Sequence, residues 1–297
     1  MIDMLTRLDS EHKIKYVFFD TGVEYQATKD HLDFLEKKYN IRIERMKALL
    51  PIPACCKKYG QPFLSKYVSE TMERLQRHNF QWEDEPFDDL LIKYPKCKSA
   101  LKWWCSWYDS DLAKNFPTQA GNTSKWSISR NAYLKEFILK EPPQFKISAK
   151  CCTYAKKKVS AEAEVEANAD LLVMGIRKAE GGVRAGAYKS CYGYESHKGL
   201  DVFRPLFWYT QADKDYYCER FNVTHSRCYT DYGLKRTGCV GCPFNRKIVD
   251  ELHVIEENEP KLYKACTTMF AESYEYTRKY REFVKTMKEG LNELSNH

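Results

Sequence analysis

The pattern that most restricts the fold of this chain is a strand, a helix and a second strand within residues 15–46. Residues 15–20 form an apolar run of strand length that ends on a carboxylate, and residues 41–46 are the next strand. Between them, residues 27–39 place Leu32, Phe34 and Leu35 on the inward face of an amphipathic helix. Two strands joined by a helix at this spacing pair in parallel. The sequence therefore predicts an α/β fold with a parallel sheet.

The sheet pattern returns only after a long stretch of helical patterns. Residues 169–175 form an apolar strand that ends on a glycine, and we expect residues 201–206 to form a further strand at a sheet edge. Residues 51–143 contain several tryptophans, which more often pack in a core than stack on bases. We predict three regions: an α/β domain at residues 1–50 and 144–245, a helical Trp-rich insertion at 51–143, and C-terminal helices at 246–297.

Composition narrows the class of ligand. The chain has 48 Lys and Arg residues against 41 Asp and Glu residues, so its net charge is +7. This moderate excess suits an anionic ligand such as a nucleotide, and it allows nucleic acid without requiring it. Neither a signal peptide nor a membrane-spanning apolar run is seen, and twelve cysteines indicate thiols and metal ligands rather than disulfides. We expect a cytoplasmic protein without a membrane partner.

Two cysteine pairs are the strongest chemical signal. Cys239 and Cys242 are separated by Val-Gly, and two thiols at this spacing supply half of a four-ligand site. Cys151 and Cys152 are adjacent, and adjacent side chains rarely reach one metal ion but can bind separate irons of a cluster. This favours an iron–sulfur cluster over zinc, which remains the alternative metal. The simpler alternative is a buried Cys151-Cys152 pair together with a redox or half-zinc pair at Cys239 and Cys242.

The remaining cysteines carry less information. Cys55 and Cys56 form another adjacent pair, which we interpret as a decoy. The others are dispersed along the chain: Cys97, Cys105, Cys191, Cys218, Cys228 and Cys266.

An anion site is predicted where the strands end. The strand that ends at Gly175 is followed by Arg177 and Arg184 in a glycine-rich turn, and fixed guanidinium groups can clamp a phosphate or sulfate. Asp20, Thr21 and Gly22 follow the first strand, where a carboxylate can accept hydrogen bonds from ribose. The alternatives are a solvated loop with two surface arginines and a helix N-cap at Asp20.

Four blocks of sequence, in the order in which they follow one another along the chain, resemble the phosphoadenosine-phosphosulfate (PAPS) reductase family of the adenine-nucleotide α-hydrolase-like superfamily. They cover about half of the chain: residues 17–25 with Thr28, residues 150–156, residues 175–184, and residues 204–208 leading to Tyr229, Gly233, Arg236 and the segment 238–244.

The resemblance implies a Rossmann-like sheet that binds an adenine nucleotide (ATP, APS or PAPS) and acts in sulfur transfer, sulfur reduction or adenylyl activation. An electron donor or a sulfur-carrier protein would be the partner. The residues it assigns to the nucleotide are Asp20, Thr21, Gly22, Arg177 and Arg184. Lys156, Gly175 and Arg236 are further candidates for this site, and the charges of Lys156 and Arg236 would also offset those of cluster thiolates. The residues it assigns to a 4Fe–4S cluster are Cys151, Cys152, Cys239 and Cys242.

The chain also departs from the family pattern. The nucleotide-gripping loop Ser-Gly-Gly-x-Asp-Ser is not found, since residue 1 lies in what should be the helix after it, so we expect either a truncated start or weak nucleotide binding. The family's C-terminal catalytic cysteine is also not found, so no catalytic residue is assigned. The alternative function is a non-catalytic nucleotide-sensing or DNA-modification-associated regulator on the same scaffold.

Overall fold

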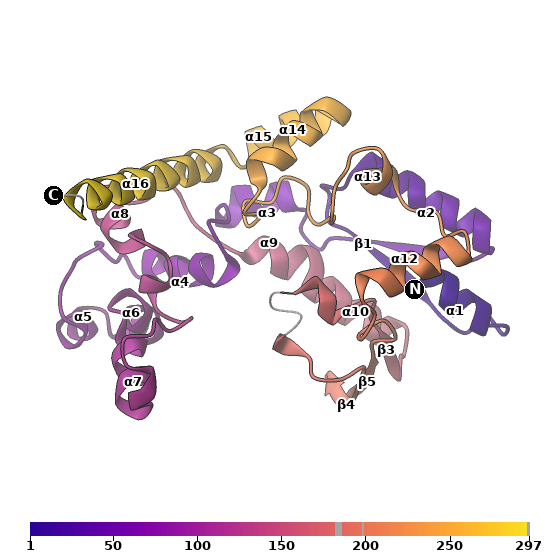
Figure 1. Cartoon of the computed structure of the whole chain (residues 1–297), viewed down its shortest axis with the longest axis horizontal. Helices are drawn as coiled ribbons and strands as arrows, with labels where there is room; N and C mark the ends of the chain where they lie inside the picture. Colours follow the sequence, from indigo (N-terminus) through magenta and orange to yellow (C-terminus); the bar gives the residue numbers. More distant parts are fainter. Residues whose placement is uncertain (182–185, 198, 296–297) are drawn as a thin grey trace. The chain divides into compact units, whose positions relative to one another are not determined.

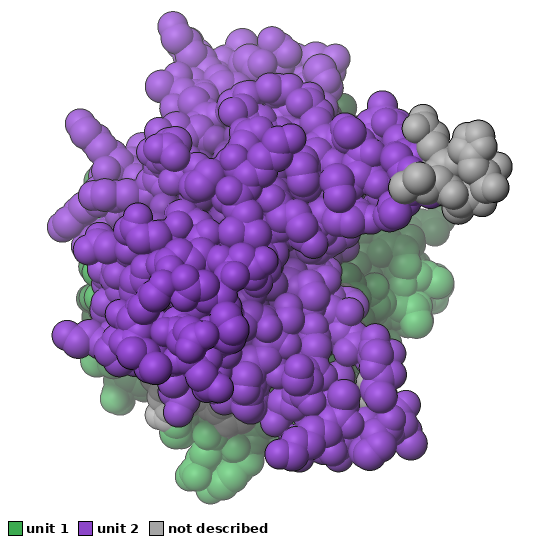
Figure 2. Space-filling model, turned by 90° about the vertical axis from the view of Figure 1, so that its left-hand side faces the viewer, with its two compact units in different colours: residues 1–51, 154–239 green, residues 52–153, 240–297 purple. Residues whose placement is uncertain are grey.

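The computed structural model describes residues 1–181, 186–197 and 199–295 (Figure 1). It has a mixed α/β structure with 55% helix, so its two sheets are small. The chain forms two compact units, each built from two stretches of sequence (Figure 2). Unit 1 comprises residues 1–51 and 154–239, and unit 2 comprises residues 52–153 and 240–297. The three regions predicted from the sequence stay a prediction, because compact units need not coincide with domains.

The first sheet of unit 1 confirms the predicted strand, helix and strand, but Phe34, predicted on the inward face of the helix, is 38% exposed. β1 (Tyr16–Asp20) and β2 (Ile43–Lys47) pair in parallel, and α2 (Gln26–Tyr39) connects them. The helix ends where Asn40 adopts the left-handed conformation (φ 49°) and its N–H donates to the carbonyl of Glu36, a common way to end a helix. α10 (Lys158–Glu166) packs against both strands.

The second sheet of unit 1 corrects the predicted edge strand. Its order is β3–β5–β4, with β3 (Leu171–Val173) parallel and β4 (Tyr192–His197) antiparallel to β5 (Leu200–Phe203). The expectation that residues 201–206 form an edge strand is wrong, since β5 is paired on both sides. β4 has the sequence Tyr-Gly-Tyr-Glu-Ser-His, which lacks the apolar run that marks a strand.

A buried carboxylate joins the helices of unit 1. Asp3 lies in α1 (Ile2–Leu8), and its side chain is 4% exposed. It accepts hydrogen bonds from Arg7 Nε at 2.9 Å, from Tyr39 Oη of α2 at 3.0 Å and from Tyr217 Oη of α12 (Gln211–Arg220) at 2.6 Å. The carboxylate is therefore fully supplied with donors, as a buried charge must be. The short helix α13 (Arg227–Thr230) completes unit 1 and packs on α2.

Unit 2 is helical, and tryptophans fill its core. Trp103 and Trp104 are completely buried, which confirms the core role predicted for these two, whereas Trp126 is 46% exposed. The Trp104 Nε1 donates to the carbonyl of Glu83 at 2.7 Å. Its helices are α3 (Ile52–Tyr59), α4 (Lys66–Arg77), α5 (Phe87–Lys93), α6 (Lys98–Trp104), α7 (Trp107–Asn115), α8 (Leu134–Lys140), α9 (Lys150–Cys152), α14 (Ile248–Asn258), α15 (Pro260–Met269) and α16 (Ala271–Ser295).

Within the described residues, every helix is too short or too polar to cross a membrane.

The Asp3 carboxylate should make unit 1 sensitive to acid. Burial acts to raise the pKa of Asp3, but the hydrogen bonds from Arg7, Tyr217 and Tyr39 outweigh it and lower the pKa from 3.8 to about 2. A carboxylate with a lowered pKa stabilises the fold above pH 3.8, and this contribution disappears as the pH falls through 2. We predict that Asp3→Asn lowers the free energy of unfolding at pH 7 by about 2 kcal/mol.

Urea denaturation of wild type and Asp3→Asn between pH 7 and pH 3 checks this prediction. The difference between the two proteins should be constant down to pH 5 and should fall to roughly half at pH 3. A difference that is the same at pH 3 as at pH 7 would show that the ionised form of Asp3 is not what stabilises the unit.

Candidate functional site

The predicted turn after β1 is built around Thr21, which is completely buried. Its hydroxyl donates to Glu24 Oε1 at 2.7 Å, and the N–H of Gly22 donates to Asp20 Oδ1 at 2.9 Å. Gly22 has a φ of +83°, and a Cβ there would lie 3.0 Å from the Cβ of Pro51. The turn therefore requires glycine and holds the Asp20 carboxylate at the carboxyl end of the strand.

Lys156 belongs to the same site through Glu24. Burial raises the pKa of Glu24, the hydroxyl of Thr21 and the charge of Lys156 act to lower it, and the charge of Asp20 acts to raise it. Lys156 lies in a π-helical segment (Thr153–Lys157) directly after α9. π-Helical segments are rare in proteins overall, but those that occur are often found at functional sites. The structure thus groups Asp20, Thr21, Gly22 and Lys156 around a carboxylate that the sequence analysis did not single out.

The other predicted nucleotide residues lie elsewhere in unit 1. Gly175 follows β3, where a Cβ would lie 3.2 Å from the Met1 Sδ. Arg177 donates from Nη1 to the carbonyl of Thr210 and from Nη2 to Gln211 Oε1, each at 3.2 Å. Arg177 therefore anchors the start of α12. Arg236 is exposed in the loop after α13, and Arg184 lies outside the described residues.

Thiols gather in unit 2 where α3 packs against α9. Cys151 is buried, and its thiol forms hydrogen bonds with the thiols of Cys152 and Cys56. The bond with Cys152 acts to lower the pKa of Cys151, but the bond with Cys56, burial, and the nearby Cys56 and Cys242 raise it overall. Cys55 is buried next to Cys152 and Lys150, and burial raises its pKa to about 11. The pair interpreted as a decoy therefore faces the predicted pair.

The loop that carries Cys242 is fixed by close packing. Gly241 has a φ of +62°, and a Cβ there would lie 2.8 Å from Tyr274 Oη and 2.9 Å from the Cys266 Sγ. The Tyr274 hydroxyl donates to the carbonyl of Gly241, and the Cys266 thiol donates to the carbonyl of Val240 at 3.5 Å. The glycine between the two cysteines is thus needed both for its backbone conformation and for its lack of a side chain.

The predicted cluster ligands divide between the units. Cys151, Cys152 and Cys242 belong to unit 2, and Cys239 is the last residue of unit 1. All twelve cysteines are described, and none forms a disulfide. Over residues 1–181, 186–197 and 199–295, no three His, Cys, Asp or Glu side chains are arranged to hold a metal ion. Cys56, Cys151 and Cys152 nevertheless supply sulfur, which is the donor atom that an iron–sulfur cluster requires.

Sequence reasoning missed Cys56, Cys266 and Glu24. The signal for Cys56 was present, since Cys55-Cys56 has the same adjacent spacing as Cys151-Cys152. No sequence signal marks Cys266, because it reaches the Cys242 loop only through the packing of α15.

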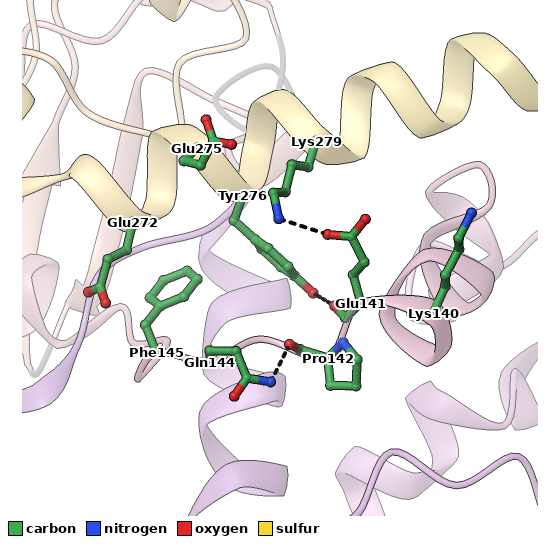
Figure 3. Close-up of a pocket in the computed structure, with 9 residues that line it drawn as sticks. All are labelled: Lys140, Glu141, Pro142, Gln144, Phe145, Glu272, Glu275, Tyr276 and Lys279. Carbon is green, nitrogen blue, oxygen red and sulfur yellow. Dashed lines mark hydrogen bonds and ion pairs between the residues drawn. The ribbon is translucent and has the colours of Figure 1, made fainter.

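A hollow of about 460 Å³ in unit 2 offers a different surface (Figure 3). Lys279 Nζ lies 3.0 Å from Glu141 Oε2, and Tyr276 Oη donates to the carbonyl of Glu141 at 2.7 Å. Glu272 accepts from Gln61 at 2.8 Å, and Glu275 pairs with Arg278 at 2.6 Å. All three carboxylates of this hollow have partners, and none of its lining residues was predicted to be functional.

A scan of the chain against protein-family models gave no match, and a search of curated proteins also gave none.

The packing around Gly241 should limit substitution. We predict that Gly241→Ala destabilises unit 2 by about 2 kcal/mol or more, because a Cβ would displace Tyr274 or Cys266 and because an L residue is strained at positive φ. Gly290→Ala is the matched control, since Gly290 lies within α16 with open space around its Cβ position. Alanine there should be neutral or stabilising. Equal stability of the two variants in urea denaturation would contradict the packing argument.

Proposed function

We propose that the chain is a PAPS-reductase-like protein that binds an adenine nucleotide in unit 1 and carries an iron–sulfur cluster on its paired cysteines. It acts in sulfur transfer, sulfur reduction or adenylyl activation. The proposal also includes that the parallel strands of unit 1 belong to a Rossmann-like sheet. The partner would be an electron donor or a sulfur-carrier protein.

The observation that carries the proposal is the contact of Cys151 with Cys152 and Cys56, near Cys242. Thiolates repel one another in a low-dielectric environment, so these grouped thiols would ionise together only with a cation beside them. Thiolate sulfur is the preferred ligand of iron–sulfur clusters. Cys151, Cys152 and Cys242 would hold the cluster, and the candidates for its fourth ligand are Cys239 from the family resemblance and Cys56 from its contact with Cys151.

When bound, the cluster would supply iron ions that can polarise an anion or carry an electron. The residues of the chain bind and orient the nucleotide. Lys156 supplies a cation, which is near enough to Glu24 to act on the pKa of that carboxyl. The Asp20 carboxylate lies at the carboxyl end of β1, where open α/β sheets bind ligands. Phosphate would bind at Lys156, and ribose hydroxyls would donate to Asp20.

One observation favours the regulator as a second candidate. The guanidinium of Arg177 is held by Thr210 and Gln211, and its Nε lies 3.9 Å from Glu180. Arg177, which was expected to neutralise the charge of the transferred group, is thus already bound to other residues of unit 1. A nucleotide sensor does not need that charge, whereas an enzyme does. Mass spectrometry of APS incubated with the protein and a reductant separates the two, since an enzyme releases AMP and sulfite and a sensor returns APS unchanged.

We predict that anaerobically purified protein contains iron and acid-labile sulfide in similar amounts and absorbs visible light. Cys151→Ser should lose more than about half of the iron, because it removes a buried ligand. Cys97→Ser is the matched control, since Cys97 is a buried thiol of the same unit that donates to the carbonyl of Arg74. Stoichiometric zinc without iron would disprove the cluster.

We also predict that Lys156→Ala weakens the binding of APS and AMP by about tenfold, because it removes one charge-assisted contact to phosphate. Lys157→Ala removes the same charge from the neighbouring exposed position and should change the dissociation constant by less than about twofold. Isothermal titration calorimetry measures both constants. Equal effects of the two substitutions would show that only the general charge of the unit matters.

A further inference from the structure

A cavity of about 370 Å³ in unit 1 lies among α1, α2 and α12. This volume is within the range of small-molecule sites in proteins. Much of the lining is apolar or aromatic, with Leu35, Leu206 and Tyr217 among its residues. Lys214, His31 and His225 also line it. An apolar cavity with a few convergent polar groups is the usual form of a ligand site.

The two histidines are the polar groups that point to a ligand. His31 lies on α2 and His225 in the segment before α13, and both are half-buried. The only ring contacts of the two imidazoles within the described residues are with Phe34, at 5.7 Å, and Tyr229, at 6.2 Å. Neither imidazole has a hydrogen-bond partner among the residues that the structure describes. Half-buried imidazole nitrogens that line a cavity without a protein partner are available to a ligand.

The charge around the cavity favours an anion. The carboxylate of Asp3 also lines it, but this group already accepts hydrogen bonds from Arg7, Tyr39 and Tyr217. It has little remaining capacity to attract a cation. The Lys214 ammonium is near enough to His225 to lower its pKa. Lys214 pairs with Asp215 at 3.6 Å, but both side chains are at least one-third exposed, so this ion pair is weak and an anion can compete for the ammonium. The cavity therefore offers donors and positive charge to an anion, since Asp3 is already satisfied.

Burial and nearby charges act on both histidines. Burial lowers the pKa of His31, and the charges of His225 and Lys38 lower it further. Burial and Lys214 also lower the pKa of His225, with the amino group of Met1 adding to them and Asp215 acting in the opposite direction. A bound anion would reverse these effects and favour the protonated rings. The remaining titratable or charged groups that line the cavity are Asp3, Tyr39, Arg177, Tyr209, Tyr217 and Cys218.

We propose that this cavity binds a small organic anion, with its charged group held by His31, His225 and Lys214 and its apolar ring against Leu35, Leu206 and Tyr217. The ligand class is an aromatic or other ring compound that bears a phosphate, sulfonate or carboxylate. Binding takes up protons at the two imidazoles and is therefore tighter in weakly acidic solution than in alkaline solution. None of the residues of this site is needed for the proposed nucleotide contacts at Lys156 and Asp20.

The probe for the test is naphthalene-2-sulfonate, whose charge does not change between pH 5.5 and pH 8. Calorimetric titration of the full chain should give at least about tenfold tighter binding of this sulfonate than of the neutral naphthalene-2-sulfonamide at pH 5.5. The preference should shrink severalfold at pH 8. The double variant His31→Asn, His225→Asn should lose both the preference and its pH dependence, whereas His253→Asn, on the exposed face of α14, should keep both.

A variant that fills the cavity tests the location without removing the histidines. Leu35→Trp should abolish binding of the sulfonate while the circular dichroism spectrum stays that of the wild type. Equal affinity for the sulfonate and the sulfonamide, the same affinity at both pH values, or unchanged binding by Leu35→Trp would each overturn the proposal. Such a result would leave the nucleotide proposal standing, because APS binding is measured at Lys156 and not in this cavity.

Discussion

The arrangement of thiols in unit 2 depends on a turn that only glycine permits. Gly241 turns the backbone in the left-handed region directly under Tyr274 and Cys266, so α15 and α16 determine where Cys242 lies. The packing of α3 on α9 brings Cys56 to Cys151 in the same unit. Two independent pieces of tertiary packing therefore converge on one group of sulfur atoms. The iron–sulfur cluster that we propose would require such a group of thiols.

In unit 1, hydrogen bonding separates structural polar groups from candidate binding groups. Asp3 and Arg177 are charged, but both side chains already form hydrogen bonds with other parts of unit 1. These bonds hold helices of the unit together. Burial is the main cause that lowers the pKa of His31 and of His225, and neither imidazole has a hydrogen-bond partner among the described residues. A charge that is saturated by the fold stabilises the fold, whereas an unsatisfied donor at a cavity recruits a ligand.

The sequence was most informative where its signals are local. The parallel pairing of β1 and β2 and the burial of Trp103 and Trp104 follow from apolar periodicity and side-chain size, and the structure has both. β4 was missed because its polar, Gly-containing sequence is held by pairing with β5. Cys56 was dismissed because its partner Cys151 lies far along the chain and meets it only through helix packing. His31 and His225 are likewise brought to one cavity by the tertiary fold.

Thiol footprinting gives the most direct test that the sulfur atoms of unit 2 act as one group. The protein is alkylated anaerobically with an isotope-coded reagent before and after reconstitution with ferrous iron and sulfide, and each cysteine is quantified by mass spectrometry. Our account predicts that iron protects Cys151, Cys152 and Cys242 together, in the same proportion, and leaves the labelling of Cys191 unchanged. Labelling rates that are independent of iron, or protection of Cys242 without Cys151 and Cys152, would contradict it.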